Sequence, residues 1–399
     1  MKLLALVIGM ILLIFVEILR VYFIMPFPGS QEDETIRIAY FLQNNINYFR
    51  LLGGIIIAYP VIYYFRNGSR AFAITLAVVL GFYAVVFYMF NFRFLADKMF
   101  LPTKTQLSLD AESNRKVSPH QLVIGVTIGD QSRAYPIEII GYHHQVRDTI
   151  AGELIMVTYC TVCRTGRVYS PVVKGKPENF RLVGMDHFNA MFEDSQTKSW
   201  WRQVNGEAIV GSLMGEKLKE IPSEQMSLSV WVNLHPGTTI LQPDSIFKEA
   251  YESIENYDEG KQKGNLTRRD STSWNEKSWI VGIQIGMDAK AYDWNDLQKL
   301  RLINDVVGHR PVLVLANADS VSFHSFDRTV EGQVLSFTMS DVNKITDTQG
   351  GSVWSWNGQC VSGPLQGKVL TPIQSYQEYW HSWRTFRPQT VKYSPTSNP

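Results

Sequence analysis

Three long apolar stretches dominate the N-terminal part of the chain and constrain its fold more than any other feature. They cover about residues 3–25, 46–65 and 71–92. A helix needs roughly 20 apolar residues to cross the hydrocarbon core of a bilayer, and each stretch is long enough. Glu17 and Arg20 interrupt the first stretch, but on a helix they share a face and can neutralise each other. We therefore expect three transmembrane helices within residues 1–100, an integral multi-pass protein and the lipid bilayer as a partner.

The charged residues beside these stretches indicate an orientation. Arg66 and Arg70 flank the short connection between the second and third stretches, whereas residues 32–34, after the first, are all acidic. Basic residues favour the cytoplasmic side of a membrane, so we expect the soluble region on the other, extracytoplasmic side. Arg50 and Arg93 oppose this assignment, because they would then lie on or near the outer side.

The rest of the chain is polar and has short alternating runs that are typical of strands, such as residues 122–128 and 153–158. The predicted fold class is α+β, with a β-rich soluble domain of two internally repeated lobes after the three-helix region. The expected segments are a connector (101–118), a first lobe (119–243), a linker (244–276), a second lobe (277–388) and a disordered tail (389–399).

The two expected lobes resemble each other in sequence. Residues 123–129 (VIGVTIG) are echoed by residues 280–286 (IVGIQIG), and Trp201 is echoed later by Trp354 in the same order along the chain. Such order-preserving matches predict a duplicated unit of roughly 120 to 150 residues. Residues present in both copies are expected to serve the shared scaffold, and residues present in one copy are the better candidates for chemistry.

Cys160 and Cys163 are two of the three cysteines in the chain and occur only in the first copy. They align with Asn317 and Ser320 of the second copy. Two thiols three residues apart can bind one soft metal ion or close a small reducible ring. His143 also lacks a counterpart, because Leu300 occupies its place in the second copy.

These motifs together resemble the family called domain of unknown function 3179, over most of residues 119–390. The resemblance implies the domain and its notable residues but no reaction, because the family has no settled activity. Arg164 follows the second cysteine where small residues are usual, and His144 stands where an acidic residue is common, so an acid–base role at position 144 is in doubt. The matching residues are Ala134-Tyr135-Pro136, His143 before Asp148, Thr158-Tyr159-Cys160-Thr161-Val162-Cys163, Asn189, Asp194, Trp201, Gly206-Glu207-Ala208-Ile209-Val210-Gly211 and His235-Pro236.

The thiols leave several functions open. As a metal site they supply half of a tetrahedral shell, and copper or zinc is the expected ion. A second hypothesis is a thiol–disulfide oxidoreductase or redox sensor, in which Arg164 and Arg167 stabilise a thiolate. A structural disulfide and inert buried thiols are further alternatives. The predicted metal ligands are Cys160, Cys163 and His143, with His144, Met185 and His187 as additional candidates.

A different class of function is a non-catalytic ligand-binding or assembly module, whose tryptophan-rich lobes hold an unknown small molecule or protein. The sequence does not decide whether the protein is an enzyme. The net charge of +1 gives no nucleic-acid footprint. Residues 125–129 lack the spacing of a dinucleotide-binding loop. Arg164 stands where a c-type haem site requires histidine, so neither haem nor a nucleotide is expected.

Overall fold

The computed structural model describes residues 1–341 and 344–395, and the chain divides into two compact units. The mixture of helices and strands, with three apolar helices before a β-rich domain of several sheets, confirms the predicted fold class. The unit boundaries do not follow the predicted segments one for one, and those segments stay a prediction. The membrane unit comprises Met1–Leu101, Glu178–Arg202 and Glu207–Lys217, and the β-rich unit comprises Pro102–Pro177, Gln203–Gly206 and Leu218–Pro399.

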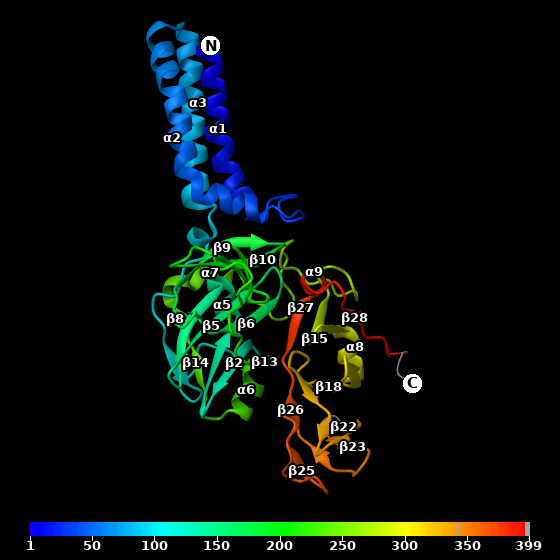
Figure 1. Ribbon diagram of the computed structural model, residues 1–399. Coiled ribbons are helices and arrows are strands. Elements are labelled where there is room, and N and C mark those ends of the chain that lie inside the picture. Colours follow the sequence, from blue (N-terminus) through cyan, green and yellow to red (C-terminus); the bar gives the residue numbers. More distant parts are fainter. Residues whose placement is uncertain (342–343, 396–399) are drawn as a thin grey trace. The chain divides into compact units, whose positions relative to one another are not determined.

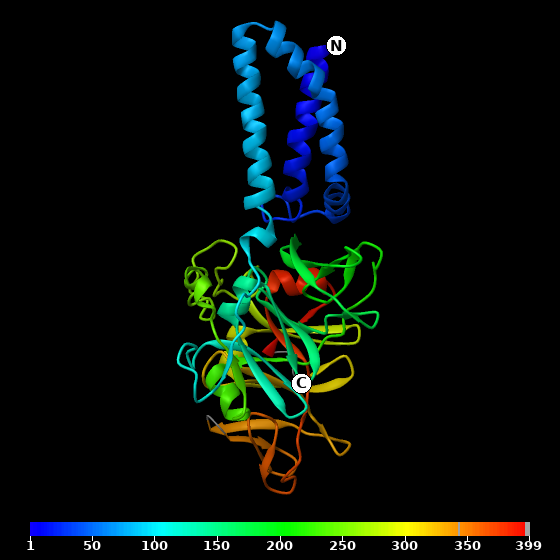
Figure 2. The same cartoon turned by 90° about the vertical axis from the view of Figure 1, so that its left-hand side faces the viewer.

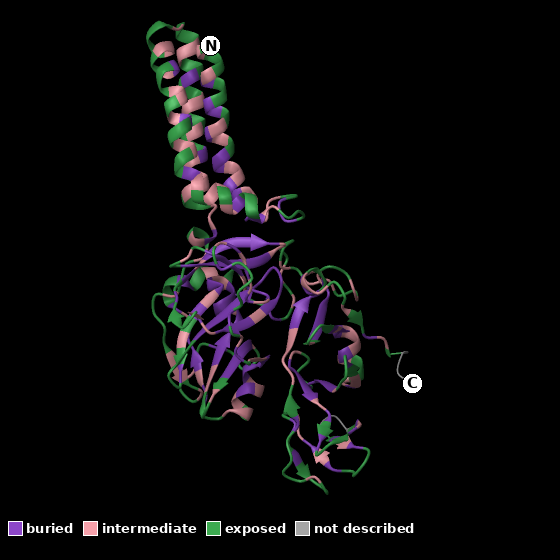
Figure 3. Ribbon diagram, viewed as in Figure 1, coloured by how far each residue is buried: buried purple, intermediate pink, exposed green. Residues whose placement is uncertain are grey.

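Three long helices run side by side in the membrane unit (Figures 1 and 2). All three are long and apolar enough to cross a membrane, as predicted. Many residues of these helices are exposed (Figure 3), which suits helices surrounded by lipid. The Ser69 side chain caps the third helix by accepting a hydrogen bond from the Phe72 N–H. The helices are α1 (Lys2–Tyr22), α2 (Ile36–Asn67) and α3 (Arg70–Tyr88), followed by the π-turn η1 (Met89–Arg93) and α4 (Ala96–Met99).

A buried polar cluster joins the three helices. Glu17 of α1 is fully buried, and its carboxylate lies 3.4 Å from Arg20, the predicted partner. Arg50 of α2 approaches the same carboxylate at 2.6 and 2.9 Å, and the Asn91 amide donates to it at 2.9 Å. Polar side chains on different helices therefore satisfy the intramembrane charge, which would be costly if it were left unpaired.

A four-stranded sheet completes the membrane unit and packs against the connections between its helices. The Met185 N–H donates to the Ile24 carbonyl at 2.7 Å, and the Phe188 N–H donates to the Gln31 side chain at 3.1 Å. The Tyr40 ring meets the Trp200 ring edge-on. In sheet order, the strands are β12 (Ala208–Val210), β11 (Trp200–Arg202), β10 (Asn189–Asp194) and β9 (Phe180–Asp186).

Within the β-rich unit, we call residues 102–177, 203–206 and 218–243 the first lobe and residues 277–341 and 344–395 the second lobe, names that follow the sequence prediction. One of its sheets has the order β1 (Ser108–Asp110), β14 (Thr239–Leu241), β3 (Gln131–Pro136), β2 (Leu122–Ile128) and β13 (Glu224–Ser227). The other sheets are β4 (Gln145–Ile150), β5 (Glu153–Cys160) and β6 (Thr165–Tyr169), and β7 (Val172–Val173) with β8 (Lys176–Pro177). Its helices are α5 (Ile137–His143) and α6 (Leu228–Leu234), and the segment that follows the lobe carries η2 (Ser245–Phe247) and α7 (Lys248–Glu252).

The second lobe begins at Lys277 and contains four sheets. The first has the order β27 (Ser375–Tyr379), β15 (Trp279–Ile285), β16 (Asp288–Asp293) and β28 (Val391–Lys392). The second has β17 (Leu302–Val307), β18 (Arg310–Ala316), β19 (Phe323–Asp327) and β26 (Thr371–Pro372). The others are β20 (Thr329–Val330) with β21 (Gln333–Val334), and β22 (Phe337–Asp341), β23 (Lys344–Asp347), β24 (Val353–Trp354) and β25 (Cys360–Ser362). The helices are α8 (Trp294–Leu300) and α9 (Trp380–Phe386).

Both lobes place a tryptophan directly over a strand glycine. A Cβ atom at Gly125 of β2 would lie 2.2 Å from the Trp231 ring, and one at Gly282 of β15 would lie 2.3 Å from the Trp383 ring. Only glycine therefore lets these indoles pack flat against their sheets. The internal repeat itself stays a prediction.

Candidate functional site

The two thiols lie in a tight turn between neighbouring antiparallel strands. Cys160 is the last residue of β5 and pairs with Thr165 of β6, so Cys163 lies in the turn between them. Arg164 closes this turn with a φ of 56°. Cys160 and Cys163 are reduced thiols that interact with each other by a hydrogen bond, and neither has exposed surface. The turn therefore holds both sulfur atoms together inside the protein.

Residues of the second lobe surround this turn. The Lys277 ammonium donates to the Val162 carbonyl at 2.6 Å and to the Leu266 carbonyl at 2.7 Å. Its nitrogen lies 3.2 Å from Nε2 of His381, and that Nε2 lies 3.1 Å from the Val162 carbonyl. We call Cys160, Cys163, Lys277, His381 and Ser382 the thiol cluster.

Backbone and hydroxyl contacts fix the turn against the second lobe. The Tyr379 N–H donates to the Cys163 carbonyl at 3.0 Å, so β27 is directly bonded to the turn. The Tyr257 hydroxyl donates to the Thr161 carbonyl at 2.8 Å. Ser382 hydrogen-bonds the Cys163 side chain from the first turn of α9. The geometry of the thiols thus depends on residues more than 90 positions away in the sequence.

Burial disfavours the charged forms of the side chains in the thiol cluster. It raises the pKa of Cys163 well above its ordinary value, and Cys160 raises it further, whereas Ser382 and Lys277 act in the opposite direction. Burial lowers the pKa of Lys277, against the effect of the two cysteines. Burial, together with the charge of Lys277, lowers the pKa of His381 to about 3. At neutral pH, Cys163 is therefore a protonated thiol and His381 a neutral imidazole.

Arg164 and Arg167, the cations expected beside a thiolate, have other partners. The Arg164 guanidinium donates to Gln377 at 2.9 Å and lies 3.7 Å from the Trp279 ring centroid. Arg167 forms a buried ion pair with Glu378. Lys277 is instead the cation that acts on the thiols. No local motif marks Lys277, His381 or Ser382, so the sequence analysis missed them.

The predicted histidines of the first lobe make local contacts. Nε2 of His143 lies 2.7 Å from the Tyr251 hydroxyl, and its ring packs edge-on against Phe247. Nδ1 of His144 lies 3.1 Å from the Tyr142 carbonyl, and burial lowers the pKa of His144 to about 4. These contacts place His143 against α7 and its neighbouring turn.

The other two candidates, Met185 and His187, belong to the membrane unit. Met185 is buried and bonded through its backbone to Ile24. His187 lies 2.8 Å from Asp186, and this hydrogen bond raises the pKa of the imidazole. Residues 1–341 and 344–395 contain no group of three or more His, Cys, Asp or Glu side chains that could hold a metal ion. The metal centre of Cys160, Cys163 and His143 therefore gains no support from the geometry and stays a prediction.

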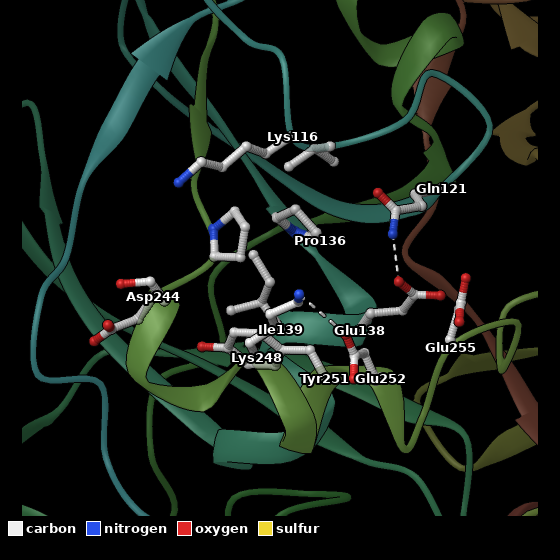
Figure 4. A pocket seen from close by; sticks show the side chains of 13 residues that line it. Lys116, Gln121, Pro136, Glu138, Ile139, Asp244, Lys248, Tyr251, Glu252 and Glu255 are labelled. Atoms are coloured by element: carbon white, nitrogen blue, oxygen red, sulfur yellow. Dashed lines mark hydrogen bonds and ion pairs between the residues drawn. The ribbon is translucent and has the colours of Figure 1, made fainter.

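Two surface pockets lie near the predicted site residues. One, of about 520 Å³, opens beside α5 and α7 and includes Tyr251, the partner of His143 (Figure 4). Glu138 and Gln121 hydrogen-bond each other in its wall (Figure 4). The other, of about 540 Å³, is lined by Lys277 together with Asp270, Glu276 and Arg384, among others. Lys277 therefore contacts both the thiol-bearing turn and a solvent-accessible hollow.

Comparison with known proteins identifies the family of the chain. The sequence model of the family described as "Protein of unknown function (DUF3179)" matches residues 104–390, which is more than half of the chain, and the chain belongs to this family. This confirms the resemblance found in the sequence. Neither a curated protein nor a solved structure matches the chain.

Proposed function

We propose that this membrane-anchored member of the family is a thiol–disulfide redox protein, either an oxidoreductase or a sensor, in which Cys160 and Cys163 alternate between a dithiol and a disulfide. The observation that carries the proposal is that both reduced thiols share one closed turn, hydrogen-bonded to each other, beside the Lys277 ammonium. A cation next to a Cys-x-x-Cys pair favours the thiolate that starts disulfide exchange.

The proposed reaction needs a disulfide compound as the oxidant. One cysteine sulfur, as a thiolate, attacks a sulfur of that compound, and the first product thiol leaves with the transferred proton. The second cysteine sulfur then attacks the mixed disulfide and displaces the second product thiol. The two cysteines lose two electrons and two protons in total, and the oxidant becomes two thiols.

Burial explains how such a pair stays reduced until it is needed. The raised pKa of Cys163 keeps its thiol protonated, which slows attack on a disulfide. Lys277 is only partly buried and lines the 540 Å³ pocket, so a shift of this side chain would connect the pocket with the thiols. An extracytoplasmic location of the domain is part of the proposal, because disulfides persist in oxidising compartments.

The test is a thiol count on the full chain in detergent. Further thiol–disulfide exchange is first blocked, and the protein is then denatured so that every thiol can be counted. The reduced protein should show three thiols, one for each cysteine. After equilibration with oxidised glutathione it should show one, that of Cys360. Replacing Cys160 and Cys163 with Ser leaves one thiol under both conditions, and the matched Cys360→Ser variant should go from two to none. A count that stays at three after oxidation contradicts the redox proposal.

Metal analysis of the same preparation distinguishes the redox function from the alternative, a metal site. The metal site of Cys160, Cys163 and His143 predicts three results. Copper or zinc should bind to the parent, should be lost from the double Ser variant, and should prevent oxidation of the thiols. In that case His143→Ala should also weaken metal binding. Thiols that neither bind metal nor oxidise would leave the non-catalytic binding module as the remaining function.

A further inference from the structure

A cleft of about 380 Å³ lies between the two lobes of the β-rich unit, apart from the thiol cluster. The first lobe lines it with residues around β13 and with Trp231 of α6. The second lobe lines it with residues of β19, β26 and the start of β27. A volume of this size, with apolar walls and a few polar groups, is typical of small-molecule sites.

Two buried polar groups in this cleft have no hydrogen-bond partner among residues 1–341 and 344–395. They are Nε2 of His324 and the hydroxyl of Ser325, and each residue is 4% exposed. Both residues line the cleft. An unsatisfied buried donor or acceptor is costly, so groups of this kind usually serve a bound molecule or water.

The charge of the cleft selects the class of ligand. Burial alone would raise the pKa of Glu224, but the interactions with His324, whose Nδ1 lies 3.7 Å from the carboxylate, act together with His235 to lower it. Among the described residues that line the cleft there is no lysine or arginine, and Trp231, Phe323 and Ile373 give apolar walls. A carboxylate beside aromatic surface favours an organic cation.

The walls of the cleft are held in place by direct bonds between the lobes. The Ser223 N–H donates to the Gln374 side chain at 3.1 Å, and the same amide donates back to the Ser223 carbonyl at 2.8 Å. The Ser227 N–H donates to the Ser322 hydroxyl at 2.9 Å. The site is therefore largely preformed, which reduces the entropic cost of binding.

We propose that this cleft binds a small organic amine, with its ammonium group at Glu224, its apolar body against Trp231 and Phe323, and a hydroxyl group between His324 and Ser325. The proposal does not depend on the thiol chemistry. It names a second site, and the redox function can fail without affecting it.

Tyramine is the probe, because it combines an ammonium group, an aromatic ring and a hydroxyl group. Isothermal titration of the full chain in detergent should show saturable binding of one molecule, and p-cresol, which lacks the ammonium group, should bind at least about tenfold more weakly. Glu224→Gln should weaken tyramine binding by a similar factor. The matched variant Glu252→Gln, in the pocket of Figure 4, should leave the affinity unchanged.

Ser325→Ala provides a second variant whose folding is not in question, because its hydroxyl has no partner to lose. It should weaken tyramine binding severalfold without lowering the unfolding temperature. The proposal is overturned if tyramine shows no saturable binding, if p-cresol binds as tightly, or if Glu252→Gln weakens binding as much as Glu224→Gln.

Discussion

The ion pair between Arg167 of β6 and Glu378 of β27 joins the two lobes through almost completely buried charges. The side chains are 1% and 0% exposed. Arg167 also donates to the Val204 carbonyl at 3.1 Å and lies 3.4 Å from the Tyr376 ring centroid. The Ser382 hydroxyl, which also contacts the Cys163 thiol, donates to Glu378 at 3.1 Å. This pair therefore connects the lobe interface to the thiol cluster.

Removing one partner should destabilise the β-rich unit strongly. Arg167→Met keeps most of the side-chain volume but removes the direct ion pair of the buried Glu378 carboxylate, which keeps the Ser382 hydroxyl and the charge of Arg387 as neighbours, and this should cost about 3–5 kcal/mol. Glu378→Gln leaves the guanidinium 3.8 Å from the Glu220 carboxylate, whose side chain is 35% exposed, and this screened contact should recover little of a loss of similar size. The double variant removes both charges, so its loss should be no larger than that of either single variant.

Urea unfolding of the full chain in detergent, followed by tryptophan fluorescence, measures these losses. The matched control is Arg384→Met, because Arg384 and Glu276 form an ion pair with side chains 49% and 76% exposed. The control should lose less than about 1 kcal/mol. The reasoning is refuted if Arg167→Met stays within about 1 kcal/mol of the parent, or if the losses of the single variants simply add in the double variant.

Two further predictions concern packing and pH. Gly282→Ala should lose about 1–3 kcal/mol in the same unfolding assay, because its Cβ atom would lie 2.3 Å from the Trp383 ring, whereas Gly237→Ala, with open space around it, should be nearly neutral. Burial raises the pKa of Asp258 to about 7, so the folded state holds a proton that the unfolded state has released. The free energy of unfolding should therefore fall as pH rises from about 4 to about 7 and then level off. Asp258→Asn should remove this fall, and a variant with the pH profile of the parent would contradict the prediction.

The sequence predicted the membrane helices well because length and hydropathy report directly on what crosses a bilayer. It missed the true start of α2, which begins at Ile36 rather than near residue 46. The additional turns contain Gln43, Asn44 and Asn45, and hydropathy cannot distinguish a polar helix end from a loop. Gln43 accepts a hydrogen bond from Arg20 at 2.9 Å, a tertiary contact that no local pattern records.

The grouping of β9–β12 with the membrane helices could not be predicted from the sequence. These strands lie within residues 119–243, the predicted first lobe, and adjacency along the chain favoured placing them there. Their position depends on backbone bonds such as that from Met185 to Ile24, between residues about 160 positions apart. Periodicity indicates that a strand forms, but it does not identify the surface on which the strand packs.

The same limit applies to the thiol cluster. The closeness of Cys160 and Cys163 follows from their spacing, and the sequence analysis used it. His143, seventeen positions upstream and without a counterpart in the second copy, was chosen with the thiols, yet it ends a short helix and contacts Tyr251. Lys277 reaches the turn from the far side of the linker. Separation along the chain was therefore a poor guide to the residues around the thiols.

The role of the second lobe follows from these contacts. Comparing the two halves favoured residues present in the first alone, and this treats the second half as a scaffold without chemistry. Yet Lys277, His381 and Ser382 all come from the second half, and the Cys163 carbonyl is bonded to Tyr379. The thiols acquire their electrostatic setting only when the lobes are docked. Any opening of the interface would move the Lys277 ammonium away from the sulfur atoms and admit water, so thiol reactivity should report on lobe docking as much as on the cysteines themselves.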